Sequence, residues 1–372
     1  MKVAVIKIGA RIAFGSSSST GSVGEAQAIC NMLRLGGADV HVYTKILEKD
    51  DPAPEGVTLH QIEEDFDSVD ADALVIINGN CNFFGGVLDR PQILNYYVLN
   101  HFNGPVFYIL CDPAIILKQI WSSVSSKDSD SLYKREDLEI IRTDIHYISQ
   151  PYNTAKYLEF INKGKNSIKI SKIDHYPFEM FPCLQPPLAV NPMPLTDLSY
   201  GGTFRGGRRA DKMIKFYFDY PEDLEVEIFG KIVLEDFDKD KIGDLKSPTF
   251  SGPVKYEQMM QKMNKSLAHV VIGDKLYEDT DDVPQRLTES VWSQVITFVD
   301  QDMDKARRIF GHDLYISDFL YVTDRNDATM KIKLLKEDDN ARQEILKYQV
   351  LALNFDADRF CKGFVELLSN RS

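Results

Sequence analysis

Residues 1–43 decide the fold class. The apolar run Val3-Ala-Val-Ile-Lys-Ile8 is followed by a segment with helical spacing of its apolar residues, Gly24–Leu35, and then by a second apolar run, Val40–Tyr43. Gly36-Gly37, directly after the helical segment, is typical of a helix C-cap. A strand, a helix and a second strand in this order predict a βαβ unit with parallel strands.

Two later segments extend this sheet. Ala73–Ile77 and Val106–Leu110 are continuous apolar runs rich in β-branched and aromatic residues. Such runs suit strands in the middle of a parallel sheet that is covered on both faces. The first half of the chain is therefore predicted to be an α/β domain.

A proline-rich stretch, Tyr176–Pro194, marks the domain boundary, because proline suits an ordered linker and cannot lie in a central strand. A second α/β set follows it. We predict two Rossmann-like α/β domains that face a central cleft: residues 1–176, a linker at 177–194, and residues 195–356, with a last helix in 357–372 that packs back on the first domain. The strands predicted in the second set are Leu224–Phe229, Ala268–Ile272, Val295–Val299 and Leu314–Ile316, and the helices are Tyr256–Ser266, Asp338–Leu353 and Ala357–Leu368.

Composition narrows the function classes. The chain has 372 residues, of which 44% are hydrophobic and 27% are charged, as in ordinary globular proteins. It has no run of eighteen apolar residues, the length that would predict a membrane span. Its five cysteines form no CxxC pair, which indicates a reducing compartment without a disulfide framework. The net charge of −13 gives no overall attraction for nucleic acid. Two basic runs, in 163–172 and 205–215, are interpreted as solvated faces rather than nucleic-acid sites.

Polar loops that contain glycine or proline follow several predicted strands. In open parallel sheets, ligands bind beyond the carboxyl ends of the strands, so these loops are candidate functional segments. They are Gly15–Glu25, Asn78–Gly86, Asp112-Pro113 and Gly273–Tyr277.

The segment Tyr200-Gly-Gly-Thr-Phe-Arg-Gly-Gly-Arg-Arg209 indicates a site for a diphosphate. Glycine lets the backbone approach a bulky anion, and arginine binds phosphate oxygens through two donors at once. A helix that starts here would add the partial positive charge of its N-terminus. The alternative is a polar turn followed by an ordinary basic helix start.

Five stretches in one order carry a family resemblance: Asn82–Gly86, Tyr200–Arg209 with Lys212-Met213, Phe250–Gly252, Ile272–Lys275, and Tyr277. With them the chain resembles the DNA β-glucosyltransferases of T-even bacteriophages, which move glucose from UDP-glucose onto 5-hydroxymethylcytosine in duplex DNA. The resemblance implies a glycosyltransferase fold of the GT-B type, with UDP held mainly by the C-terminal domain.

On the acceptor side, the resemblance implies that Asp112 is the catalytic base and that Glu25 faces the acceptor. An aspartate directly after an apolar strand suits a base that takes the proton of the attacking hydroxyl in an inverting transfer. Asp112 before Pro113 is also typical of a helix N-cap, and Glu25 of a first-turn glutamate. Asn82, Phe83 and Phe84 are expected to line the acceptor side, or to form a plain strand-end turn. The target base would be flipped out of the duplex.

On the donor side, the resemblance assigns the pyrophosphate to a first group of residues, Gly202, Thr203, Arg205 and Arg209. Arg286 is expected to support the phosphates and Glu289 to accept hydrogen bonds from the ribose; their spacing is equally that of a surface ion pair. The remaining UDP-sugar residues are Asp274 and Tyr277 and, at uracil-pocket positions, Phe229 and Val254, which by pattern alone are core residues.

The predicted ligand is a UDP-sugar, UDP-glucose or UDP-arabinose. A divalent cation, Mg²⁺ or Mn²⁺, is left open, since the acidic run Glu278–Asp282 suits either a cation or a solvated loop. The predicted partner is double-stranded DNA that contains 5-hydroxymethylcytosine, bare or already glycosylated. We expect a monomer without membrane association in the cytoplasm of the infected bacterial host. The alternative from another class is a nucleotide-binding protein that has lost the transfer activity.

Overall fold

The computed structural model describes residues 1–8, 21–44, 55–62, 68–78, 97–110, 141–163, 170–205, 209–230, 232–233, 243, 245–255, 258–311 and 315–371. The chain forms two compact units, one of Met1–Phe178 with Asp356–Ser372 and one of Glu179–Phe355. The boundaries predicted at 176 and 356 lie beside these divisions. Within the predicted linker, Phe178–Leu184 form a 3-10 helix.

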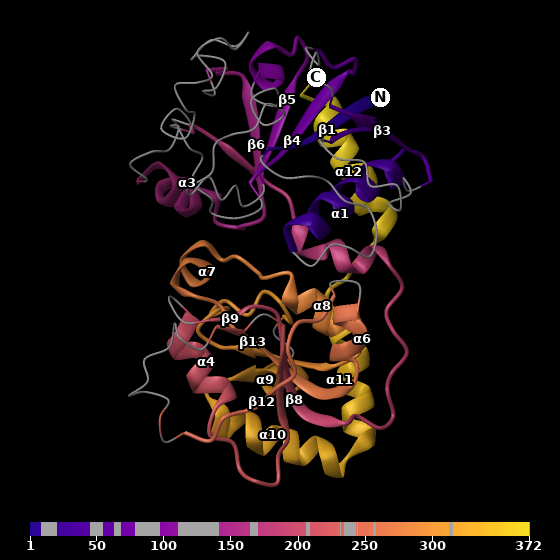
Figure 1. Ribbon diagram of the computed structural model, residues 1–372. Helices are drawn as coiled ribbons and strands as arrows, with labels where there is room; N and C mark the ends of the chain where they lie inside the picture. The colour runs from indigo at the N-terminus through magenta and orange to yellow at the C-terminus, as the bar shows by residue number, and fades with distance from the viewer. Residues whose placement is uncertain are drawn as a thin grey trace. The chain divides into compact units, whose positions relative to one another are not determined.

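The N-terminal unit is built on a seven-stranded parallel sheet with the strand order β3-β2-β1-β4-β5-β6-β7 (Figure 1). The order reverses between β1 and β4, so this is the switch point at which a ligand is expected in such a sheet. The strands are β1 (Lys2–Ile8), β2 (Asp39–Thr44), β3 (Val57–Gln61), β4 (Ala73–Asn78), β5 (Val106–Leu110), β6 (Ile145–Ser149) and β7 (Ile173–His175).

Helices cover both faces of this sheet. Successive strand residues point to opposite faces, and Val5 and Ile6 of β1 are both fully buried. On one face, Tyr157 of α3 (Thr154–Lys163) packs with apolar residues of β1, β4, β5 and β6. The apolar runs of the sequence are therefore central strands, as predicted.

The last helix of the chain, α12 (Ala357–Ser369), packs beside α1 (Gly21–Leu35) in the N-terminal unit (Figure 1). The two helices are close at the end of α1, where a Cβ on Gly36 would lie 2.4 Å from the backbone oxygen of Cys361. The Tyr176 hydroxyl donates a hydrogen bond to the carbonyl of Phe360. The C-terminal segment is thus a part of the first unit's core.

The C-terminal unit has a six-stranded parallel sheet in the order β12-β10-β8-β13-β14-β15, with a separate pair, β11-β9. The strands are β8 (Thr196–Gly201), β9 (Phe204–Arg205), β10 (Val226–Phe229), β11 (Ile232–Val233), β12 (Thr249–Phe250), β13 (Ser266–Val271), β14 (Ile296–Asp300) and β15 (Tyr321–Val322). The order reverses between β8 and β13.

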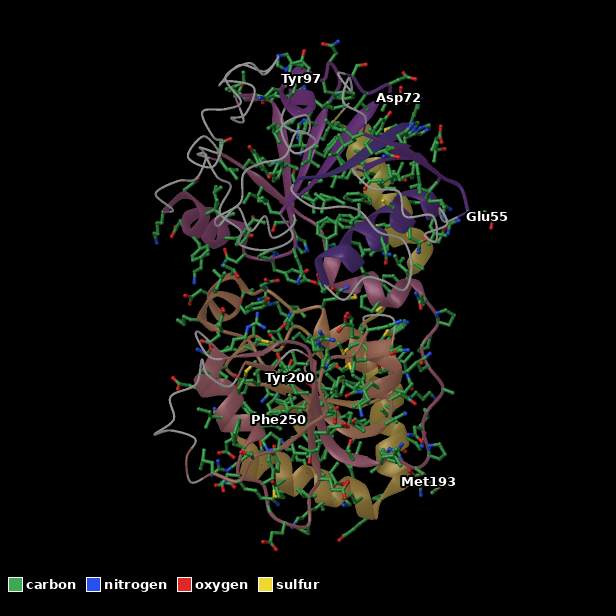
Figure 2. The ribbon with its side chains drawn as sticks, viewed as in Figure 1. Glu55, Asp72, Tyr97, Met193, Tyr200 and Phe250 are labelled. Carbon is green, nitrogen blue, oxygen red and sulfur yellow. The ribbon has the colours of Figure 1, made fainter. Side chains whose placement is uncertain are left out.

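Its helices are α4 (Ala210–Tyr217), α6 (Met259–Met263), α7 (Lys275–Thr280), α8 (Arg286–Trp292), α9 (Ile316–Leu320), α10 (Arg325–Glu337) and α11 (Asp339–Ala352). The largest apolar cluster joins the sheet to α4, α8, α10 and α11. Figure 2 shows Tyr200 in this interior and Met193, 77% exposed, at the surface. Among the described residues, no helix combines the length and the apolar character needed to cross a membrane.

Two predicted elements need correction. The predicted strand Leu314–Ile316 is wrong, because Ile316 opens helix α9 and the strand follows at Tyr321. Ile316, Phe319 and Leu320 have helical spacing, which a short apolar run does not distinguish from a strand. The helix predicted at Tyr256–Ser266 is shorter, since Ser266 is already the first residue of β13.

Candidate functional site

The candidate donor site lies where β8 and β13 separate. Their pairing ends at Ser199 and His269, and the hydroxyl of Tyr217 then lies against β13, donating to the Val270 carbonyl at 2.5 Å and accepting from the Val270 N–H at 3.1 Å. The Nδ1 atom of His269 is 2.7 Å from the carbonyl oxygen of Ser199. Side chains thus satisfy backbone groups at the switch point, where this type of sheet binds ligands.

Two glycines allow the turns after β8 and β10 to meet. Gly202 has φ +137° and Gly230 has φ +127°, a region that side chains rarely adopt. A Cβ on Gly230 would lie 2.0 Å from the Gly202 carbonyl oxygen, and a Cβ on Gly202 would lie 3.2 Å from Nη2 of Arg286. The guanidinium of Arg286 therefore lies directly against the bare backbone of Gly202, beside the exposed Thr203.

Arg209 is held in place by Tyr277. Its Nη2 atom donates to the Tyr277 hydroxyl at 3.2 Å, and its guanidinium carbon lies 5.0 Å from the centre of the Tyr277 ring. Burial opposes the charge of Arg209, but Tyr277, Tyr200 and Asp274 outweigh it and raise the pKa of the guanidinium. Arg209 is also the residue before α4, so a permanent cation lies at a helix N-terminus.

Arg286 and Glu289, one turn apart on α8, form an ion pair. The Glu289 side chain is 4% exposed and that of Arg286 is 24% exposed. The interpretation as a surface ion pair is therefore wrong for Glu289, which is inside the unit. A cation that is partly exposed and held by a buried carboxylate suits phosphate binding, which stays a prediction for Arg286.

His269 is neutral at physiological pH. Burial, with a further contribution from the Arg286 cation, lowers the pKa of its imidazole to about 3. The imidazole therefore adds no charge beside the two guanidinium groups, which are accompanied by the carboxylates of Glu289 and Asp274.

Asp274 caps α7. Its side chain is buried and accepts a hydrogen bond from the Leu276 N–H at 2.9 Å. This capping fixes the start of the helix that carries Tyr277. The predicted role of Asp274 in UDP-sugar binding is not tested by this contact.

Phe229 lies in the core, an interpretation that the sequence left open. Its fully buried ring packs with Met259, Met263 and Val295, and Val254 packs against this cluster. The Gly230 N–H donates to the Gly252 carbonyl at 2.7 Å, which ties the turn after β10 to the segment that leads to Val254. Uracil contacts of Phe229 and Val254 remain predictions.

The basic run 205–215 is only in part a solvated face. Arg209 contacts Tyr277 as described, and Nζ of Lys212 lies 2.5 Å from Oδ2 of Asp300, 2.8 Å from Oδ2 of Asp302 and 3.5 Å from Oε1 of Glu278. Asp300 and Asp302 were not expected from the sequence. Asp300 is the last residue of β14 and Asp302 lies two residues after it, so both are at the end of an apolar strand, the same signal as for Asp112.

The acidic run Glu278–Asp282 is not a solvated loop at its start, because α7 extends to Thr280. Within the described ranges, no three histidine, cysteine, aspartate or glutamate side chains are placed to hold a metal ion. Instead these carboxylates meet basic side chains: Lys212 contacts Glu278, Lys275 contacts Asp279, and Arg308 contacts Asp281.

Most predicted acceptor-side residues lie outside the described residues, namely Asn82, Phe83, Phe84 and Asp112. Glu25 lies in α1, but its side chain is not described, and neither is that of Arg205 in β9. The described strand β5 ends at the buried Leu110, two residues before Asp112.

Comparisons with known proteins agree with the sequence resemblance. The sequence model of the family described as Bacteriophage T4 beta-glucosyltransferase matches residues 1–183. The DNA beta-glucosyltransferase of Enterobacteria phage T4 is 29% identical over 299 residues, which are 78% of this chain and 80% of that protein.

Solved structures share the fold over the whole chain. T4 phage BGT in complex with UDP and Mn²⁺ matches with a TM-score of 0.80 at 24% identity, and 99% of each chain is covered. An alpha-glucosyltransferase in complex with UDP and a 13-mer DNA matches with a TM-score of 0.60 at 11% identity, over 99% of this chain and 100% of that chain. The predicted α/β class of the GT-B type is thereby confirmed.

Proposed function

We propose that this chain, which matches the sequence model of the bacteriophage T4 beta-glucosyltransferase family over residues 1–183, is a UDP-sugar-dependent glycosyltransferase that moves glucose from UDP-glucose to DNA. The relative with 29% identity is a DNA beta-glucosyltransferase, and T4 phage BGT has been solved with UDP-glucose. These names support both the donor and the acceptor polymer.

The observation that carries the donor assignment is the arrangement of two cations at the switch point of the C-terminal unit. Arg286 lies against Gly202, and Arg209 is held by Tyr277. As the bond between the sugar and UDP breaks, negative charge develops on the diphosphate. Cations that are already oriented stabilise this charge without reorganisation, which lowers the barrier.

For the acceptor we propose the hydroxymethyl group of 5-hydroxymethylcytosine, flipped out of the duplex. Its oxygen attacks the anomeric carbon, the bond from that carbon to the UDP oxygen breaks, and UDP leaves with the electron pair. Asp112 takes the hydroxyl proton as general base. Attack from the side opposite to UDP inverts the anomeric configuration.

Two features support Asp112 in this role. It follows the buried strand β5, which is next to the switch point between β1 and β4. It also matches the position of the family's base in the sequence resemblance. Glu25, in the first turns of α1 at the same switch point, is proposed to face the acceptor.

The proposal includes a divalent cation only as an ion that binds together with UDP. T4 phage BGT has been solved with UDP and Mn²⁺. The steps proposed here are those of the chain's own residues, and the cation would accompany the diphosphate of UDP. We further propose a monomer that acts in the cytoplasm of an infected bacterium.

Mass spectrometry of nucleosides tests the function directly. DNA that contains 5-hydroxymethylcytosine is incubated with the protein and UDP-glucose, or with UDP-arabinose, and is then digested. We expect the mass of one hexose on hydroxymethylcytosine with UDP-glucose, and none on DNA with unmodified cytosine. If only UDP-arabinose gives a mass gain, that of a pentose, the donor is UDP-arabinose instead of UDP-glucose. If neither donor adds mass to hydroxymethylcytosine, whether bare or already glycosylated, the transferase assignment is contradicted.

A further inference from the structure

Lys212 lies in a buried ion-pair cluster that no predicted catalytic or binding role uses. Its Nζ atom contacts Asp300 at 2.5 Å, Asp302 at 2.8 Å and Glu278 at 3.5 Å. Asp300 is fully buried, whereas the Asp302 side chain is 42% exposed. The cation therefore lies between α4, α7 and the end of β14.

The buried carboxylate depends on this cation. Burial raises the pKa of the Asp300 carboxyl, and the hydrogen bond from Lys212 opposes that effect. Burial likewise disfavours the charged lysine, but Asp300 and Asp302 outweigh it and raise its pKa. Each charge offsets the free-energy cost of burying the other, so removing one partner alone would leave an uncompensated buried charge.

The cluster is adjacent to the Arg209–Tyr277 contact on both sides. Lys212 is three residues after Arg209, on the first turn of α4, and Glu278 is next to Tyr277 on α7. Arg209, the residue before α4, makes no side-chain capping bond to that helix. Lys212 therefore adds an ion-pair connection from this end of α4 to β14 and α7, beside the Arg209–Tyr277 contact.

Direct phosphate binding by Lys212 is disfavoured. Three carboxylates surround one ammonium group, so the local charge is negative and repels a diphosphate. The side chain is also only 19% exposed. Its effect on a bound nucleotide must act through the groups that it orients.

We propose that Lys212 is a positioning residue for the nucleoside diphosphate: it ties α4 to β14 and α7 and thereby holds Arg209 and Tyr277 in the geometry that binds the donor phosphates. This inference rests on the proposed function for its ligand. It adds a cluster outside the donor-binding residues and predicts an energetic coupling between Lys212 and Arg209.

A double-mutant cycle tests the coupling, with UDP binding measured by calorimetry. The combined change Lys212→Met with Asp300→Asn removes both charges, so that no unpaired charge is left buried. We expect it to weaken UDP binding about tenfold, the loss of part of one charge-assisted contact. In an Arg209→Met background, the same change should have almost no further effect.

Lys215→Met is the matched control, because it removes the same charge from the same helix at a half-exposed position and loses only a 3.9 Å contact to the exposed end of the cluster, Asp302. It should change UDP affinity less than about twofold, which limits the long-range contribution of one lysine charge. Full additivity of the Lys212→Met/Asp300→Asn change with Arg209→Met would overturn the inference, and so would an unchanged affinity.

A second, milder variant applies if that double variant does not fold. Glu278→Gln breaks the contact between Lys212 and α7, together with a 3.6 Å contact to Lys275 on the same helix. Asp279→Asn removes the same charge from the same helix and also releases Lys275, so it is the control. Loss of a negative charge near an anion site strengthens binding by itself. If Glu278→Gln binds UDP about threefold more weakly than the wild type and Asp279→Asn does not, the loss reports the lost positioning. If Glu278→Gln binds UDP as tightly as the wild type or more tightly, the positioning role is refuted.

These measurements need no DNA. If glucose transfer to DNA fails but the cycle shows coupling, the positioning role stands and only the acceptor assignment falls. If the wild-type protein does not bind UDP, the donor part of the proposed function is itself contradicted before any variant is compared.

Discussion

The substitution Gly230→Ala is predicted to disable the donor site from a position that bears no functional group. The added Cβ would lie 2.0 Å from the carbonyl oxygen of Gly202 and 2.8 Å from its carbonyl carbon. Both atoms belong to the backbone, so a change of side-chain rotamer cannot relieve the clash. The contact must lengthen by about 1 Å before it reaches the shortest separation that real Cβ atoms show, 3.0 Å.

The magnitude follows from strain and displacement. Gly230 has φ +127°, where a residue with a Cβ costs about 1–3 kcal/mol, and overpacking adds a similar amount. We expect the free energy of unfolding of the C-terminal unit to fall by about 3 kcal/mol. A shift of about 1 Å at Gly202 also moves the backbone against Arg286, which should lower kcat/KM for UDP-glucose about 100-fold.

The control is Gly311→Ala in the same unit, where φ is +71° and, apart from its chain neighbours, no atom of the described residues lies within 4 Å of the added Cβ. It should cost about 1 kcal/mol of stability through the left-handed backbone alone and leave UDP binding intact. Urea unfolding and calorimetry with UDP separate the two effects. A folded Gly230→Ala protein that binds UDP as tightly as Gly311→Ala would refute the argument that the Gly202–Gly230 contact shapes the donor site.

Three further predictions concern other parts of the molecule. Replacing Asp112 by Asn should lower the glucose-transfer rate at least about 100-fold while UDP affinity stays at the wild-type value; undiminished transfer in a rate assay would remove Asp112 from the role of base. Tyr277→Phe keeps the ring under Arg209 and loses only the hydroxyl, so calorimetry should show UDP binding weaker by about 1 kcal/mol, and Tyr277→Leu should lose more because the cation–π contact goes as well. His269 should make the protein less stable in mild acid: its pKa is lowered from 6.5 to about 3 in the folded state, so below pH 6.5 the unfolded state binds the extra proton and stability falls as the pH falls towards 3. Between pH 7 and pH 5 this amounts to about 2 kcal/mol, and urea unfolding of His269→Gln should show a correspondingly smaller loss over that interval.

Strands that are continuous apolar runs could be predicted, whereas a strand with polar residues could not. The runs at Val3–Ile8, Ala73–Ile77 and Val106–Leu110 are β1, β4 and β5. In contrast, β8 at Thr196–Gly201 carries Thr196, Asp197 and Ser199 and was missed, although it is one of the two central strands of its sheet, beside the switch point. Its polar residues are accommodated by neighbours, as when Asp197 accepts from the Glu225 N–H at 2.9 Å.

The donor site could be located but not resolved from the sequence. Glycines and arginines in 200–209 predicted an anion site, because their backbone freedom and charge are properties of the residues themselves. The same pattern was consistent with a solvated basic helix, and Glu289 with a surface ion pair. Burial, a property of the packed unit, excluded the surface interpretation for Glu289, whereas phosphate binding by the residues in 200–209 stays a prediction.

The sequence by itself determined the α/β class, the parallel strands and the residue types that can bind a diphosphate, because strand and helix periodicities and side-chain chemistry are local. Only the tertiary structure decided which of those groups meet. Lys212 and Asp300 are 88 residues apart, and Arg209 and Tyr277 are 68 apart. Each pair forms because parallel strands bring the carboxyl ends of β8, β13 and β14 to one edge of the sheet, and no local pattern encodes a contact made across several intervening strands and helices.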